Sequence, residues 1–317
     1  MSPPRVSVVM PVHNAAAWVG SSIGSLLGQD LDGLEVVVVD DGSTDGSADA
    51  VQAVADDRVR LVRQANTGIV GALAEALRHT TAPVVARQDA DDLSLPGRLS
   101  AQLAVLADPD VVACGCTYDV VDPEDRVLST IAPPPDDVGI RRRMLVRNPY
   151  AGGSLMVRRA ALDRIGGFSS AFRSAEDYEV LVRLAAVGRL GSATALSYAW
   201  RVHDTNTSTQ VRDLELATDR RIKDDVWRQE PPAALGRREL LAMWQRCSDS
   251  DPDTGPVIAA QLLRNELLLA GALMRRGRRR QAAAALAVVA GLPRAATGPV
   301  ARDVPARLRE VRRHRSR

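Results

Sequence analysis

The sequence predicts an α/β fold with a mainly parallel sheet covered by helices on both faces, followed by a region built from helices alone. Three observations lead to this prediction. Short, uninterrupted runs of β-branched residues at 6–12 and 34–39 are typical of strands buried on both faces of a sheet. Segments with helical spacing separate these runs, and no strand signal remains beyond about Val211. At about 150 residues per domain, the 317 residues suggest two domains, which we place at 1–210 and 211–317.

The first part of the chain alternates strands and helices. Strands are predicted at 6–12, 34–39, 59–62 and 83–86. Helices are predicted at 16–27, 47–55, 67–78 and 99–106, with Ser47 placed to cap the second of them. Strands that alternate with helices of this length indicate right-handed crossovers and parallel pairing.

The middle of the chain predicts a further lobe on the same sheet. Its expected strands are 111–121, 126–131, 154–157 and 195–200, and its expected helices are 136–146, 159–165 and 175–187. After residue 210 the pattern predicts only helices, at 214–227, 236–246, 256–276 and 278–289.

Composition narrows the class of protein. A hydrophobic content of 45% is sufficient for a sizeable core, and no apolar run reaches the roughly 20 residues of a membrane-spanning helix. The apolar run Val6–Val12 is too short for a signal peptide, so we expect a cytoplasmic protein. The chain has three cysteines, which argues against a disulfide framework, and Cys114 and Cys116 are expected to be core thiols on one side of a strand.

The basic charge is concentrated at the C-terminal end. From Arg275 onward, 13 arginines stand against Asp303 and Glu310, whereas the rest of the chain is net acidic. One interpretation is peripheral contact with an anionic membrane at the inner face, and the other is a solvated helix face followed by a tail. Nucleic-acid binding is not expected, because aromatic residues do not interleave with these arginines.

Carboxylates follow two of the predicted parallel strands. Asp40 and Asp41 close the second strand, and Asp89 and Asp91 close the fourth. Ligands of open α/β sheets bind beyond the carboxyl ends of the strands, so these groups are expected to line one crevice. The sequence has no glycine-rich phosphate loop, but a divalent cation held by Asp-x-Asp would neutralise a diphosphate. The alternative for a lone aspartate pair is a helix cap or a solvated turn.

Five ordered segments resemble the family-2 glycosyltransferases, whose catalytic domain has the GT-A fold, and the resemblance runs from Val6 to about Ser208. The five segments are Val-Ser-Val-Val-Met-Pro-Val-His-Asn (6–14), Glu-Val-Val-Val-Val-Asp-Asp-Gly-Ser-Thr-Asp (35–45), Ala-Arg-Gln-Asp-Ala-Asp-Asp (86–92) followed by Pro96, Arg98-Leu99 and Gln102, Gly-Gly-Phe (166–168) and Ala-Glu-Asp-Tyr-Glu-Val (175–180).

The resemblance implies a donor site for a nucleotide-diphosphate sugar. By it, Pro11 and Asp41 line the nucleoside pocket, with Asp40 supporting the turn. Asp89 would hold the ribose, and Asp91 would bind a divalent cation, Mn²⁺ or Mg²⁺, that bridges the diphosphate.

The resemblance also implies an inverting reaction with a base on the acceptor side. Asp177 matches the family's base, with Glu176 as support, and a carboxylate is suited to take the proton of an attacking hydroxyl. The alternative is that both acids only complement the dipole of the helix they begin.

Four further residues complete the candidate site. His203, in an Arg-x-His segment, would close over the metal or the diphosphate, which favours Mn²⁺; otherwise it is a loop histidine. Arg201 would pair with the diphosphate or lie on the surface. Asp92 is expected to cap the following helix, and Asn14 is a supporting residue.

The sequence departs from the family at several points. The Gln/Arg-x-x-Arg-Trp segment of processive synthases is absent, which favours one transfer per encounter. The segment 148–154, in which relatives often carry a histidine, contains glycines instead. The identity of the acceptor, a glycan or a lipid-linked glycan, is therefore not specified. The expected role is cell-surface polysaccharide or glycoconjugate synthesis. A sugar nucleotidyltransferase and a non-catalytic sugar-nucleotide-binding scaffold are the alternatives.

Overall fold

The computed structural model describes residues 3–144, 147–172, 174–204 and 206, together with the isolated positions 222, 270, 274, 277, 280, 282, 283 and 286. The described residues belong to two compact units. The first contains residues up to Thr130 and those from Tyr150 onward as far as Ile222, and the second contains Ile131–Pro149 and the positions after residue 222.

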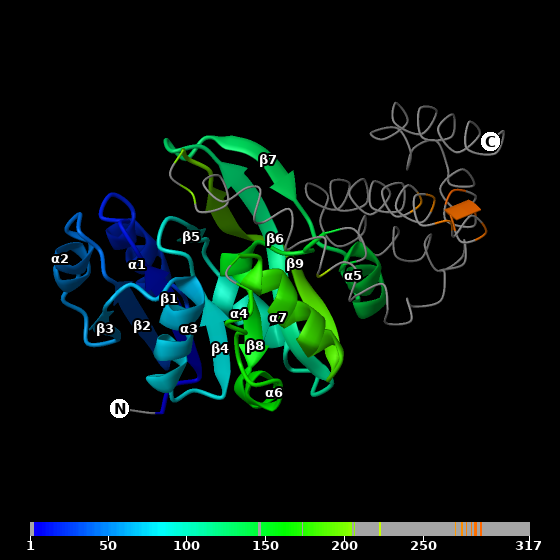
Figure 1. Ribbon diagram of the computed structural model, residues 1–317, viewed down its shortest axis with the longest axis horizontal. Coiled ribbons are helices and arrows are strands. Elements are labelled where there is room, and N and C mark those ends of the chain that lie inside the picture. Colours follow the sequence, from blue (N-terminus) through cyan, green and yellow to red (C-terminus); the bar gives the residue numbers. More distant parts are fainter. Residues whose placement is uncertain are drawn as a thin grey trace. The chain divides into compact units, whose positions relative to one another are not determined.

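The first unit is built on a nine-stranded sheet in the order β3-β2-β1-β4-β8-β6-β9-β5, with β7 paired to β6 (Figure 1). The strands are β1 (Val6–Val12), β2 (Leu34–Asp41), β3 (Val59–Gln64), β4 (Val84–Arg87), β5 (Leu93–Ser94), β6 (Val111–Val121), β7 (Val127–Ile131), β8 (Met156–Arg158) and β9 (Arg189–Arg201). Parallel pairing joins β3, β2, β1 and β4, so the carboxyl ends of these four strands lie at one edge. Strand β8 runs antiparallel between β4 and β6, and β9 is parallel to β6.

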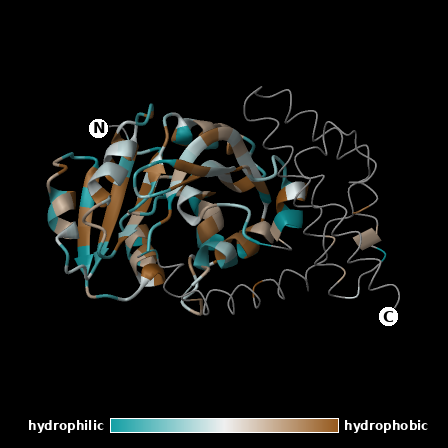
Figure 2. Ribbon diagram, turned by 90° about the horizontal axis from the view of Figure 1, so that it is seen from above, coloured by the Kyte–Doolittle hydropathy of each residue, from teal (hydrophilic) through white to brown (hydrophobic). Residues whose placement is uncertain are grey.

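The helices of the first unit pack on the sheet, and its parallel part has helices on both faces. The helices of this unit are α1 (Val19–Leu27), α2 (Ser47–Gln52), α3 (Ile69–Arg78), α4 (Arg98–Val105), α6 (Arg159–Arg164) and α7 (Glu176–Ala185), with a 3₁₀ turn η1 (Gly152–Ser154). Val8 of β1 packs in one cluster with residues of α1, α2 and α4, whereas the next residue, Val9, packs against α3. This alternation follows from the period of two in a strand. Figure 2 shows hydrophobic residues along the strands.

The structure confirms the predicted fold class and most of the predicted elements, with some shifts at element ends, and three differences have a clear physical reason. Strand β9 begins at Arg189, before the predicted start at Ala195, because it pairs with β6 along that strand's length. The short strand β5 was not predicted, and it exists through its pairing with β9. Ser47 does not cap α2; Gly46 is the cap residue, and the Asp45 carboxylate accepts the backbone N–H of Ser47 at 3.0 Å.

The described part of the second unit contains the helix α5 (Asp137–Met144). The helices predicted after residue 210 and the basic C-terminal segment lie outside the described residues, apart from isolated positions. No helix in the described ranges has the length and apolar character needed to cross a membrane. Cys114 and Cys116 are buried free thiols, as predicted, and burial raises the pKa of Cys116 to about 11.

Candidate active site

The end of β2 carries a buried carboxylate that holds the loop between β3 and α3. Asp41 is 3% exposed. Its Oδ1 accepts hydrogen bonds from Gln64 Nε2 at 2.7 Å and the backbone N–H of Thr67 at 2.9 Å, and Oδ2 accepts from the backbone N–H of Gly68 at 2.8 Å. The carboxylate therefore fixes the loop that borders the carboxyl edge of β2 and β3.

The neighbouring predicted residues build the same edge. Asp40 accepts the backbone N–H of Ser43 at 3.0 Å and so closes the turn after β2. Asn14, in the left-handed conformation with φ 53°, accepts the backbone N–H of Thr44 at 2.9 Å. Pro11, half-buried in β1, pairs in register with Val39 of β2. The end of β1 is thus tied to the turn that follows β2.

The second carboxylate group follows β4. Asp89 Oδ1 accepts a hydrogen bond from Arg87 Nε at 2.8 Å, and the Asp89 backbone carbonyl accepts one from the Ser22 hydroxyl at 3.0 Å. Burial raises the pKa of Asp89 and outweighs the lowering effect of the Arg87 charge. Asp89 therefore lies beside a permanent cation, and its side chain is 27% exposed.

The expectation that Asp92 caps the following helix is wrong. Asp92 is 1% exposed, and its carboxylate accepts the Tyr198 hydroxyl at 2.7 Å and the backbone N–H of Arg201 at 2.8 Å. Helix α4 begins after Gly97 without a side-chain cap. Asp92 instead joins the segment after β4 to β9. Burial, with Asp91 and Asp89 nearby, raises its pKa well above the ordinary value.

Asp91 and His203 meet, although 112 positions separate them in the chain. His203 Nε2 lies 3.0 Å from Asp91 Oδ2, and Asn206 Nδ2 donates to the same oxygen at 3.1 Å. The imidazole stacks on the Trp18 indole, with ring centroids 5.6 Å apart and an interplanar angle of 22°. The ring of His203 is therefore held from one side by a carboxylate and from another by an aromatic face.

Arg201 is not a surface arginine. Its side chain is 2% exposed and lies over the Trp18 ring at 4.5 Å from the centroid. One guanidinium nitrogen donates to the Asp91 carbonyl, and another contacts Asp125 Oδ1 at 2.5 Å. Arg201 thus ties the turn between β6 and β7 to the Asp91 segment.

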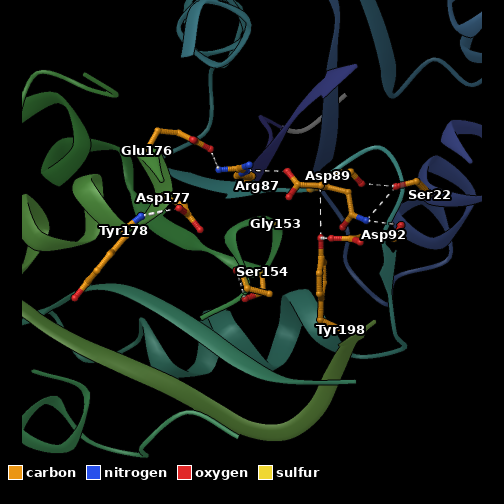
Figure 3. Close-up of polar contacts among 12 residues, drawn as sticks. Ser22, Arg87, Asp89, Asp92, Gly153, Ser154, Glu176, Asp177, Tyr178 and Tyr198 are labelled. Atoms are coloured by element: carbon orange, nitrogen blue, oxygen red, sulfur yellow. Dashed lines mark hydrogen bonds and ion pairs between the residues drawn. The ribbon is translucent and has the colours of Figure 1, made fainter. Parts of the chain in front are cut away.

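Gly153 lies between Asp89 and Asp177 of α7 (Figure 3), and Gly152 precedes it in the 3₁₀ turn η1. A Cβ added to Gly152 would lie 2.8 Å from Asp177 Oδ2, and one added to Gly153 would lie 2.0 Å from the Tyr198 hydroxyl and 3.0 Å from Asp89 Cγ. A side chain at Gly153 would meet the backbone of Asp89 as well as the Tyr198 hydroxyl, whereas a methyl group at Gly152 would displace the Asp177 side chain.

Two buried residues of α4 hold the glycine segment in place. The fully buried Arg98 donates to the Gly153 carbonyl at 2.9 Å and to the Arg87 carbonyl at 2.7 Å. Gln102 donates to the Ser154 carbonyl at 2.7 Å. These bonds satisfy backbone carbonyls outside the ladder and fix η1 against the end of β4.

Glu176 and Asp177 begin α7, directly after Ala175, which has the left-handed φ of 56°. Glu176 accepts Arg87 Nη1 at 2.8 Å. Asp177 Oδ1 accepts the backbone N–H of Tyr178 at 2.8 Å. Burial and the neighbouring Glu176 raise the pKa of Asp177 to about 7, against the lowering effect of Arg87.

The structure adds residues to which the sequence gave no role. Arg87 bridges Asp89 and Glu176, Trp18 stacks on His203, and Tyr198 donates to Asp92. Arg87 was visible inside the 86–92 motif, but its partner Glu176 lies 89 positions away. Asn206, three residues after His203, was also missed.

The residues at the Asp91 site fit a hard divalent cation. They offer one carboxylate and one imidazole in contact, with side-chain exposures of 24% and 12%. Mg²⁺ and Mn²⁺ bind through one or two protein ligands when phosphate oxygens complete the shell. No group of three or more His, Cys, Asp or Glu side chains suited to a metal occurs in the described part of the chain, so phosphate oxygens or water would have to complete the shell of a cation held by Asp91 and His203.

Comparison with known proteins gives consistent matches. The family model described as Glycosyl transferase family 2 matches residues 7–166. EpsE of Bacillus subtilis, whose name describes it as a glycosyltransferase, is 33% identical over 191 residues, which cover 57% of this chain and 67% of EpsE. Chondroitin synthase of Pasteurella multocida is 26% identical over 215 residues, which cover 67% of this chain and 22% of the synthase. An uncharacterized glycosyltransferase of Nostoc, 35% identical over 127 residues, is matched over 39% of both chains.

Two solved structures share the fold. The mannosyltransferase PcManGT from Pyrobaculum calidifontis, in complex with GDP-Man and Mn²⁺, superposes with a TM-score of 0.52 at 25% identity, covering 97% of this chain and 81% of PcManGT. S. aureus TarS 1-349 in complex with UDP gives a TM-score of 0.57 at 17% identity, covering 90% of this chain and 88% of that one.

Proposed function

The chain belongs to glycosyl transferase family 2 and has the GT-A fold of its glycosyltransferases, and we propose that it moves one sugar from a nucleotide-diphosphate sugar to an acceptor hydroxyl with inversion at the anomeric carbon. One observation carries the proposal. The strand-end carboxylate of Asp89 and the carboxylate of Asp177 approach the glycine pair 152–153 from its two residues, Asp177 against Gly152 and Asp89 against Gly153, and Asp91 follows two positions after Asp89.

The donor side is supported by the edge formed by β1, β2 and β4. Pro11 and Asp41 border the proposed nucleoside pocket, and Asp89 lies where the ribose would follow. The Asp41 carboxylate already accepts from the 64–68 loop, three times at Oδ1 and once at Oδ2, so it shapes the pocket by holding that loop and would accept from the nucleobase at Oδ2. The PcManGT complex with GDP-Man supports a nucleotide sugar as the donor class.

Asp91 and His203 would hold the divalent cation. When bound, the cation stabilises the negative charge that develops on the departing nucleoside diphosphate. The Mn²⁺ in the PcManGT complex and the imidazole beside Asp91 favour Mn²⁺.

Asp177 would act as the general base. The acceptor hydroxyl oxygen forms a bond to the anomeric carbon, the bond from that carbon to the diphosphate oxygen breaks, and the hydroxyl proton passes to the Asp177 carboxylate. A base with a pKa of about 7 is well matched to this task near neutral pH, since it is both partly ionised and basic. Attack from the side opposite the leaving group inverts the anomeric configuration.

The acceptor is proposed to be a glycan or a lipid-linked glycan, in the synthesis of a cell-surface polysaccharide or glycoconjugate. The match to chondroitin synthase of Pasteurella multocida supports a glycan acceptor. The Gly152–Ser154 turn offers no side-chain contact from its two glycines, so the acceptor would be recognised by residues around them.

The test is thermal stabilisation by UDP, GDP, dTDP or CDP, each with Mn²⁺ or with EDTA, because a ligand that binds only the folded protein raises its melting temperature. The proposal expects a shift for one nucleotide that requires Mn²⁺ and is lost in Asp91→Ala. If none of the four nucleotides changes the melting temperature, the donor assignment is contradicted.

A further inference from the structure

Arg87 is a buried arginine at the end of β4 to which neither donor binding nor proton transfer assigns a role. It is 5% exposed. Its backbone N–H donates to the Leu155 carbonyl at 2.8 Å, and its carbonyl accepts from Arg98 at 2.7 Å. The backbone of Arg87 is therefore held in place, and its side chain extends from this fixed position.

The guanidinium joins two carboxylates from distant parts of the chain. Nε donates to Asp89 Oδ1 at 2.8 Å, and Nη1 donates to Glu176 Oε1 at 2.8 Å (Figure 3). The side chains of Arg87 and Glu176 are 6% and 7% exposed, so water and salt screen this pair weakly. Asp89 is on the donor side, and Glu176 precedes the proposed base.

Among the described residues, the main charges that act on Asp177 come from two elements. Glu176 acts from its own helix, and Arg87 and Asp89 act from the end of β4. Glu176 and Asp89 disfavour the ionised carboxylate, whereas Arg87 favours it. The backbone of Gly152 also lies against the Asp177 side chain. Arg87 thus compensates the carboxylates that surround the base.

We propose that Arg87 is a positioning residue for sugar transfer: its guanidinium ties the first turn of α7 to the donor-side carboxylate, and its positive charge keeps Asp177 available as a proton acceptor. This inference rests on the proposed function, because it assigns Arg87 a task for the base named there. Keeping Asp177 ionisable requires only a positive charge at position 87, whereas bridging Asp89 and α7 requires the planar guanidinium.

Two variants that break the same ion pair separate this role from simple support of the fold. Arg87→Met removes the cation and leaves Glu176 and Asp89 uncompensated, so Asp177 holds its proton to higher pH. Glu176→Gln removes an anion and lets Asp177 lose its proton at lower pH. An ion pair that only supports the structure would give the same kind of loss in both variants.

The experiment follows the ionisation of Asp177 directly. Aspartate carboxyl groups are labelled with ¹³C, the Asp177 signal is identified as the one missing in Asp177→Asn, and it is titrated by NMR in each variant. We expect the midpoint to move up by about one pH unit or more in Arg87→Met, down in Glu176→Gln, and to stay near wild type in Arg87→Lys. The acid limb of kcat/KM, measured as nucleoside diphosphate released from the donor that the nucleotide panel identifies, moves in the same directions.

The bridge that Arg87 forms between Asp89 and Glu176 is tested in the same series. Arg87→Lys keeps the charge but cannot bridge both carboxylates, so its kcat is expected to fall about tenfold with an unshifted acid limb. Arg183→Met is the matched control, because it breaks the Arg183–Glu179 pair of the same helix, at 2.5 Å, and Arg183 is not among the main charges that act on Asp177. Its melting temperature falls, whereas its NMR midpoint stays at the wild-type value.

Midpoints that move in the same direction in Arg87→Met and Glu176→Gln, or that do not move in folded variants, overturn the inference. If Arg87→Met does not fold, Glu176→Gln alone decides, since an unchanged or higher midpoint contradicts the proposal. Failure of the proposed function looks different: the wild type would then release no nucleoside diphosphate from any donor, whatever the NMR midpoints show.

Discussion

Gly152 lies against Asp177 so closely that a Cβ at this glycine would stand 2.8 Å from the carboxylate oxygen Oδ2. The neighbouring Gly153 has the corresponding relation to Tyr198 and Asp89. The backbone of this turn therefore lies between the proposed base and the proposed donor site, with Gly152 next to the base and Gly153 next to the donor side.

Gly152→Ala is expected to reduce kcat by about 10-fold to 100-fold with little change in stability. The added methyl group displaces the end of the Asp177 side chain, and a base displaced by about 1 Å from its productive position loses activity on this scale. Turnover and melting temperature measure the two effects. Gly20→Ala is the control, because nothing lies within 4 Å of a Cβ at Gly20 in α1. Equal turnover in both variants would contradict the assignment of Asp177.

Asp177→Asn is expected to become more stable relative to wild type as pH rises. The pKa of Asp177 is raised from 3.8 to about 7 in the folded state, so the folded protein binds this proton more tightly than the unfolded chain. Wild-type stability from this group is full below pH about 4 and declines until pH about 7. Melting curves from pH 4 to pH 8 should show a growing difference on the order of a few degrees. A constant difference would show that Asp177 has an ordinary pKa.

Tyr198→Phe is expected to cost about 1–3 kcal/mol in the free energy of unfolding, because it leaves the buried Asp92 carboxyl without one of its donors. Denaturant unfolding measures the cost. In Asp92→Asn the same Tyr198→Phe change should cost less, since a neutral amide needs that donor less than a carboxylate does. Equal costs in both backgrounds would mean that the two side chains are not coupled.

Trp18→Ala is expected to weaken Mn²⁺ binding about 10-fold, because the indole that orients His203 is lost, whereas Trp18→Phe keeps an aromatic face and should bind within a few-fold of wild type. Calorimetric titration of Mn²⁺ in the presence of the stabilising nucleoside diphosphate measures both affinities. Loss of affinity in His203→Ala but not in Trp18→Ala would show that the stacking does not orient the ligand.

The elements that local pattern determines could be predicted from the sequence. Strand β1 matches its predicted bounds, Val6–Val12, because an unbroken apolar run is typical of a strand buried on both faces. The position of Asp177 in the first turn of its helix was likewise predicted. Strand β9 was predicted too short, because its first half is defined by pairing with β6 and not by its own composition.

Long-range partners could not be predicted from the sequence. Asp92 has the local features of a helix cap, but the hydroxyl it accepts belongs to Tyr198, which is 106 positions away. Arg87 has no local sign of its bridging contacts, because one of them, Glu176, reaches it only through the fold. The closeness of Gly152 to Asp177 depends on Arg98 and Gln102, which position the turn from α4.

The most direct test of the account compares wild type and Asp177→Asn in the release of nucleoside diphosphate from the donor sugar nucleotide that the nucleotide panel selects, with a glycan acceptor present and binding of the same nucleotide measured in parallel. The account predicts unchanged nucleotide affinity and a loss of turnover of about 100-fold or more in Asp177→Asn. Turnover at the wild-type rate in Asp177→Asn would show that Asp177 does not accept the proton and would contradict the mechanism.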